Sequence, residues 1–276
     1  MAAEIRQAFV MNTELAGITE SAHSRRALLL CGLDSSIAVL NALAVTLGNE
    51  PGWVVTSAGV SLQSNSYQEF AFPVDDAAPT DFDIALQGCI NTVPSLVENL
   101  AASSGCRNVW ICGFGIMATA VMLALSGGSL GIFGSSLDTS KDGVEVAGLA
   151  CVGMEVPVGN GEVPEKAYGA VSEEAANDRG KPGLSHEGTG KLEGYNLSLG
   201  DYIIEAVESI NALSSLMVIH GLEDKITPPN YARRAVSSCR SAKADSLRLL
   251  GGAGHDLYAD PRVVALLIGW MDRTPL

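Results

Sequence analysis

Residues 111–118 read ICGFGIMA, and they decide the fold of this 276-residue chain. They join an apolar run at 108–113 to an uncharged segment with helical character at 116–125. A buried strand that turns sharply into a buried helix explains this pattern. Gly115 lies at the turn. Because glycine adopts a left-handed backbone without steric cost, we expect a positive φ angle there.

The same region raises the alternative of a membrane helix. Residues 109–137 contain no charged side chain and are long enough to cross a bilayer. However, six glycines interrupt this run and no basic flank marks an orientation. The sequence therefore favours a strand followed by a helix, and we do not expect an integral membrane protein.

Short apolar runs alternate with helical patterns along the chain. We expect strands at 26–32, 52–59, 108–113, 144–154, 215–221 and 246–252. We expect helices at 37–48, 82–104, 116–125, 201–213, 229–239 and 261–271, with Pro94 kinking or dividing the second of these. Strands that alternate with crossover helices predict an α/β fold with a mostly parallel central sheet and helices on both faces. The length suits one domain over residues 1–276.

One segment departs from this alternation. Residues 155–200 are rich in Gly, Glu, Asn and Lys and show no apolar periodicity. With few apolar side chains to bury, the segment is expected to be a cap-like or mobile insertion beside the edge of the site.

Composition excludes several classes of function. The net charge of −14 argues against binding to nucleic acid or to anionic membrane surfaces. Six cysteines without paired spacing, and a beginning without signal-peptide character, favour the cytoplasm or another reducing intracellular compartment. The four histidines show no metal-ligand spacing, so we expect neither a metal site nor a cofactor.

Two acid–base residues follow successive expected strands near the end of the chain. Asp224 comes after the strand at 215–221, and His255 follows the strand at 246–252 after a glycine-containing turn. In parallel sheets, catalytic groups gather beyond the carboxyl ends of the strands. We therefore expect Asp224 and His255 to touch. Alternatively, Asp224 caps the following helix and His255 merely stabilises the loops.

These stretches resemble the α/β-hydrolase superfamily, in particular its small carboxylesterases and acyl-protein thioesterases. HGLEDKITP at 220–228 is similar to the acid turn of that group, and LCGLDSS at 30–36 is similar to its oxyanion loop. The resemblance implies that Asp224 and His255 are the acid and the histidine of a catalytic triad. It also implies an oxyanion site or pocket built from Gly32, Leu33, Ile116 and Met117.

The departures from the family pattern fall at the reactive positions. Gly115 stands where the family has its nucleophilic serine, and Met117 stands where the motif ends in glycine. In the oxyanion loop, Cys31 replaces a histidine and Asp34 replaces a glycine. Acyl-enzyme chemistry at residue 115 is thereby excluded, and Asp34 would oppose an oxyanion. A deliberate serine-to-glycine replacement would explain only one of these four departures.

Other nucleophiles have weaker support. Cys112 lies inside an expected strand and is predicted to be a core thiol, whereas Cys31 lies nearer the expected pocket and could be reachable. Ser35 and Ser36 precede the helix at 37–48 and are predicted to cap it.

Two hypotheses follow from these residues. In the first, the protein has lost hydrolase chemistry and uses the site to bind a small acyl-type molecule, or uses the fold to bind a protein partner. In the second, the Asp224–His255 pair activates water in an ester or thioester hydrolase, or transfers a proton in a lyase- or epimerase-like reaction. The first is preferred because a water route lacks covalent catalysis. The sequence leaves the oligomeric state open.

Overall fold

The computed structural model describes residues 3–8, 26–62, 81–126, 144–156, 210, 213, 215–239 and 246–274. In chain order the strands are β1 (Ala3–Ala8), β2 (Arg26–Leu33), β3 (Trp53–Leu62), β4 (Asn108–Phe114), β5 (Glu145–Val152), β6 (Ser215–Gly221) and β7 (Leu247–Leu250). The α-helices are α1 (Ile37–Leu47), α2 (Asp81–Ser104), α3 (Ile116–Ser126), α5 (Pro229–Ser238) and α6 (Pro261–Arg273). A short 3-10 turn, Asp34–Ser36, precedes α1.

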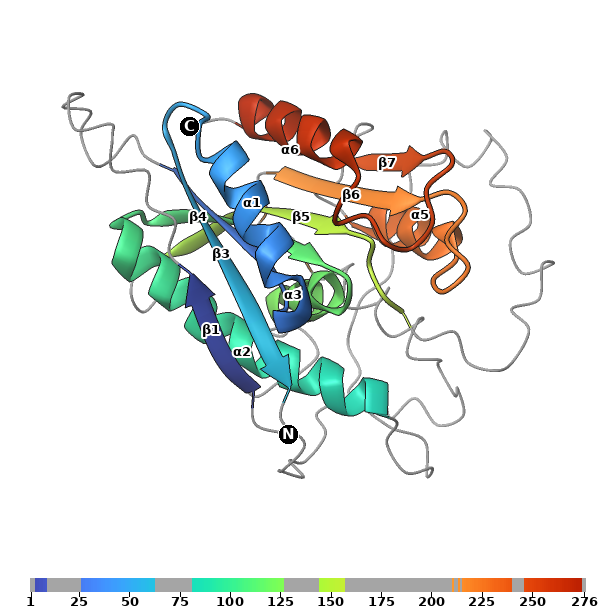
Figure 1. The fold of residues 1–276 in the computed structure, drawn as a ribbon, viewed down its shortest axis with the longest axis horizontal. Helices are drawn as coiled ribbons and strands as arrows, with labels where there is room; N and C mark the ends of the chain where they lie inside the picture. Colours follow the sequence, from blue (N-terminus) through green and yellow to red (C-terminus); the bar gives the residue numbers. More distant parts are fainter. Residues whose placement is uncertain are drawn as a thin grey trace, which may run out of the picture.

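These strands form one sheet in the order β1-β3-β2-β4-β5-β6-β7 (Figure 1). The strands from β3 to β7 in this order run parallel, and only β1 is antiparallel to its neighbour β3. The first strand, β1, lies at one edge, and from β2 the chain crosses to β3 on one side and then runs from β4 to β7 on the other. The carboxyl ends of β4, β5, β6 and β7 lie in a row at one edge, which is where a parallel sheet gathers its functional loops.

Helices cover both faces of the sheet (Figure 1). One buried cluster joins one face to α2, α3 and α5, and a second cluster joins the other face to α1 and α6. Strands covered on both sides have near-continuous apolar sequences, and β4 and β6 are buried along almost their whole length. The expected α/β class with helices on both faces is confirmed.

The uncharged run that begins at Val109 is divided between two elements. It forms most of β4, turns at Gly115 and continues as α3, whose side chains are almost all buried. None of the described helices is both long and apolar enough to span a bilayer.

Several boundaries differ from the sequence-based expectation. The β1 strand was not predicted, because six residues of mixed polarity at a sheet edge give little periodic signal. Helix α2 runs through Pro94 as one element rather than being divided. The expected insertion at 155–200 and the expected helix at 201–213 lie almost wholly outside the described residues.

A close approach between β4 and α3 depends on Gly113. A Cβ atom at this position would lie 2.6 Å from the Cα atom of Ala118 and 2.8 Å from its nitrogen. Both are backbone atoms of the helix, so a side chain at residue 113 would push α3 away from the sheet.

We therefore predict that Gly113→Ala lowers the free energy of unfolding by about 1–3 kcal/mol, the usual cost of an overpacked core. Urea denaturation measures this change. Gly251→Ala is the matched control, because a Cβ there meets no atom within 4 Å. Equal stability of the two variants would contradict the proposed contact.

Candidate functional site

The turn between β4 and α3 has the geometry expected from the sequence. Gly115 has a φ angle of +57°, which confirms the predicted left-handed backbone. Its N–H donates to the carbonyl of Val152 at the end of β5 (3.0 Å), and its carbonyl accepts from the N–H of Ala118 (3.0 Å). Ile116 begins α3, so its N–H belongs to the first helical turn, where backbone donors lack intrahelical partners.

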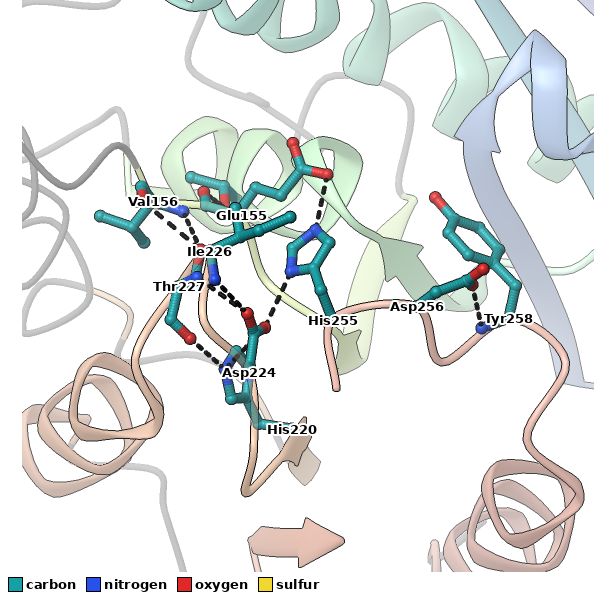
Figure 2. A network of polar contacts seen from close by, with 10 residues as sticks. Glu155, Val156, His220, Asp224, Ile226, Thr227, His255, Asp256 and Tyr258 are labelled. Carbon is teal, nitrogen blue, oxygen red and sulfur yellow. Dashed lines mark hydrogen bonds and ion pairs between the residues drawn. The ribbon is translucent and has the colours of Figure 1, made fainter. Parts of the chain in front are cut away.

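Asp224 and His255 are in direct contact, as the order of their loops predicts. The Asp224 Oδ2 atom lies 2.8 Å from Nδ1 of His255 (Figure 2). The Asp224 side chain is fully buried, whereas that of His255 is 20% exposed. This contact fixes the imidazole so that its other nitrogen, Nε2, points away from Asp224.

The remaining bonds of Asp224 are made within its own loop. Its Oδ1 atom accepts hydrogen bonds from the N–H groups of Ile226 (2.8 Å) and Thr227 (2.9 Å). Helix α5 begins only at Pro229 and has no side-chain cap. The alternative in which Asp224 caps this helix is therefore wrong. The carboxylate orders the turn after β6 because the short Asp side chain reaches backbone groups two and three residues ahead.

His220 supports Asp224 from below (Figure 2). Its Nε2 lies 2.8 Å from the carbonyl oxygen of Thr227 and 3.3 Å from Asp224 Oδ2, so Nε2 carries the proton. Burial lowers the pKa of His220, although the contacts with Thr227 and Asp224 oppose this shift. Its Nδ1 atom has no hydrogen-bond partner among the described residues. His220 is thus a neutral structural histidine.

Glu155 is the residue that sequence reasoning missed. Its Oε1 atom lies 3.1 Å from Nε2 of His255 (Figure 2). The same oxygen lies 3.1 Å from the position that a Cβ atom on Gly115 would take. The carboxylate therefore fills space that a serine at residue 115 would share. Its position just beyond β5 is the sequence feature that points to the site. However, Glu155 is also the first residue of the polar segment 155–200, which obscures this feature.

Two buried threonines hold the backbone around Glu155. Thr119 of α3 donates its hydroxyl to the carbonyl of Glu155. Thr227 accepts a hydrogen bond from the N–H of Val156 at 3.1 Å. The segment after β5 is thereby tied to α3 and to the Asp224 loop, which directs the Glu155 side chain towards His255.

Tyr258 also lies beside the Gly115 position. Its ring stacks on Phe114 with centroids 5.2 Å apart, and its hydroxyl lies 3.1 Å from the Cβ position of Gly115. The ring edge also lies 3.5 Å from the Cβ position of Gly32 in the expected oxyanion loop. Burial raises the pKa of Tyr258 to about 12, so the phenol keeps its proton at neutral pH.

The two carboxylates control the charge of His255. Burial by itself would lower the pKa of His255, but hydrogen bonds and charge attraction from Glu155 and Asp224 outweigh it. The pKa of His255 is therefore raised, which favours the imidazolium form.

The other residues expected near the pocket make contacts elsewhere in the structure. Leu33 ends β2 and its carbonyl accepts a hydrogen bond from the Ser36 hydroxyl at 2.7 Å. Ser36 makes no side-chain cap to α1, so the predicted capping role is wrong for this residue. Met117 is fully buried in the core, and the atoms nearest to the Cβ position of Gly115 belong to Glu155 and Tyr258 instead.

The structure also locates Asp34 and the two cysteines considered as nucleophiles. The Asp34 carboxylate lies 3.2 Å from the Cβ position of Gly59 on β3, so the carboxylate found beside Gly115 is that of Glu155. Cys31 and Cys112 are fully buried, and burial raises the pKa of both thiols. Cys112 is a core thiol as predicted. Cys31 is not reachable as a nucleophile.

No three histidine, cysteine or carboxylate side chains are gathered to hold a metal ion within the described parts of the chain. The Glu155, His255 and Asp224 groups instead form a line in which each carboxylate bonds a different imidazole nitrogen.

Comparison with solved structures identifies the fold. A protein from Thermus thermophilus, TT1662, superposes with a TM-score of 0.54 at 16% identity, covering 98% of this chain and 97% of that one. The monoacylglycerol lipase of Paleococcus ferrophilus gives 0.52 at 13% identity over the whole of both chains. Est1E from Butyrivibrio proteoclasticus, solved with ferulic acid, gives 0.52 at 13% identity over 99% and 96%.

These likenesses show that the chain has the α/β-hydrolase fold, as the sequence resemblance implied. Neither a protein-family model nor a curated protein sequence matches the chain. At such low identity the structural likeness establishes the fold alone. The function therefore has to be inferred from the site.

The raised pKa of His255 predicts how its contribution to stability depends on pH. The unfolded value is about 6.5, so the stabilisation is complete below that pH and is lost as the pH rises through the higher folded-state value. We expect the difference in unfolding free energy between wild type and His255→Gln to be larger at about pH 6 than at about pH 9.

Urea denaturation at several pH values measures this difference. Arg262→Gln is the control, because Arg262 pairs with Asp260 on the surface and neither group titrates in this range. A His255 difference that is flat, or that grows with pH, would contradict a carboxylate-stabilised imidazolium.

Proposed function

We propose that this chain is an α/β-hydrolase-fold protein that has lost the catalytic serine and acts without ester hydrolysis, by binding a small molecule at the Gly115 site. The observation that carries the proposal is the turn between β4 and α3. It has the left-handed geometry of a nucleophile turn, but Gly115 brings no hydroxyl to it.

The state of His255 supports the same conclusion. A serine hydrolase needs Nε2 of a neutral histidine to accept the serine proton. Here Nε2 faces the Glu155 carboxylate at 3.1 Å, and the pKa of the imidazole is raised. An imidazolium donates hydrogen bonds and does not accept a proton. The site is therefore arranged to bind a hydrogen-bond acceptor rather than to activate a nucleophile.

A second candidate is an enzyme that moves a proton without covalent catalysis. The 2.8 Å contact between Asp224 and His255 favours it, because this pair orients an imidazole in the way that acid–base catalysis requires. Protonated His255 would act as an acid on a bound substrate, in a lyase- or epimerase-like step. The non-hydrolytic proposal has a second form, in which the protein uses its fold to bind a protein partner.

The test of the main proposal is ester hydrolysis. We expect the unmodified protein to show no more than trace turnover of short p-nitrophenyl esters and no labelling by a fluorophosphonate probe, which reacts with activated serines. Robust turnover by the unmodified protein, abolished in His255→Ala, would overturn the non-hydrolytic proposal and establish a water or relocated nucleophile.

A serine at residue 115 should not by itself restore the activity. In Gly115→Ser the new side chain meets the Glu155 oxygen, which already occupies Nε2 of His255. We expect Gly115→Ser/Glu155→Ala to hydrolyse p-nitrophenyl acetate at least about tenfold faster than Gly115→Ser, since the base is then available to the hydroxyl. Equal rates in the single and double variants would show that Glu155 does not block His255.

A further inference from the structure

His255 lies between two carboxylates that differ in accessibility. The Asp224 side chain is fully buried and accepts hydrogen bonds from two backbone N–H groups besides its contact with Nδ1 of His255. The Glu155 side chain is 31% exposed, and within the described residues its carboxylate bonds only to Nε2 of His255. One carboxylate is thus buried with several partners, whereas the other is partly exposed and, among the described residues, is held at His255 by one contact.

The Glu155 carboxylate occupies a place that presents a hydrogen-bond donor of His255 and adjoins Gly115. Nε2–H of His255 faces it from the loop after β7, and the Tyr258 hydroxyl, which hydrogen-bonds the Ser36 side chain, lies 3.1 Å from the Cβ position of Gly115. Ile116, which follows Gly115 in the chain, begins helix α3. A protonated imidazole that presents an N–H to a partly exposed place can bind an anionic oxygen there.

We propose that this place is a carboxylate-binding subsite, that the Glu155 side chain is its built-in occupant, and that a small carboxylic acid binds there by displacing Glu155. The inference rests on the proposed function, because a serine side chain at residue 115 would take part of the same space.

Charge selects the class of ligand. The titratable groups that interact with His255 are Glu155 beyond β5, and Asp224 and His220 from β6 and its loop, while Tyr258 lies beside the Gly115 position. His220 and Tyr258 are neutral, so the imidazolium depends on the two carboxylates. A ligand that displaces Glu155 must replace its negative charge. A carboxylate does so. A neutral ester or amide would leave only one of the two negative charges beside the imidazolium.

Removal of Glu155 tests the subsite directly. In Glu155→Ala we expect the pKa of His255, followed by the NMR shift of its ring protons, to fall relative to wild type. Acetate should raise it again, and acetamide, which has the same shape without the charge, should not. Acetate should bind the variant at least about tenfold more tightly than wild type, because the tethered carboxylate no longer competes.

Three further variants complete the design. Glu223→Ala removes another glutamate from the loop after β6, one that contacts the N–H of Gly252 and not His255. It should leave both the pKa of His255 and the acetate response at wild-type values. Glu155→Gln should lower the pKa of His255 without gaining an acetate response, because the amide still fills the space. Glu155→Ser offers a second opened site if the alanine variant does not fold.

The outcomes separate this inference from the proposed function. An unchanged pKa of His255 in both opened variants, or an equal acetate response in all proteins, overturns the subsite and leaves the absence of ester hydrolysis untouched. Ester turnover by the unmodified protein overturns the proposed function, whatever acetate does to the variants. A response to acetamide equal to that of acetate would show that space, and not charge, governs binding.

Discussion

The site depends on one buried charge. A carboxylate such as that of Asp224, removed from water by the sheet and its loops, is tolerated only where hydrogen-bond donors compensate it. Two backbone N–H groups and the imidazole of His255 provide those donors. The same bonds give the loop after β6 its shape and aim the histidine. The orientation of the histidine and the stability of the loop therefore come from the same contacts, at a site where Gly115 brings no nucleophilic side chain.

Glycines allow the elements to approach closely enough for this arrangement. Gly113 lets α3 lie against the sheet, and Gly221 lets the backbone at 253–254 rest on the end of β6, where a Cβ would collide with carbonyl oxygens. Gly153 similarly leaves room for the carbonyl of His255 at 3.1 Å from its Cβ position. These contacts join three carboxyl-terminal strand ends into one surface, so Glu155, Asp224 and His255 meet although they are far apart in the chain.

A carboxylate in front of the histidine distinguishes this site from that of a serine hydrolase. In a serine hydrolase, the histidine faces a neutral hydroxyl and accepts its proton. Here Nε2 of the histidine faces the Glu155 carboxylate, and, against the opposing effect of burial, hydrogen bonds and charge attraction from Glu155 and Asp224 raise the pKa of the imidazole. The raised pKa favours the protonated histidine, whereas a serine hydrolase needs the neutral form. Fold likeness alone therefore says little about what this protein does.

The sequence by itself determined the α/β class, nearly all of the described strands and helices, the left-handed turn at Gly115 and the pairing of Asp224 with His255. Each of these depends on local pattern, on backbone preference or on the rule that parallel strands end at the same edge.

Only the tertiary structure decided which side chain faces Nε2 of His255. Glu155 follows β5 in a polar stretch that looks solvated, and Asp34 was the carboxylate expected near the oxyanion. The direction of each side chain decides which carboxylate faces His255. Thr119 and the Thr227–Val156 contact turn Glu155 inward, while Asp34 lies against β3, and contacts of this kind join residues that no sequence period relates.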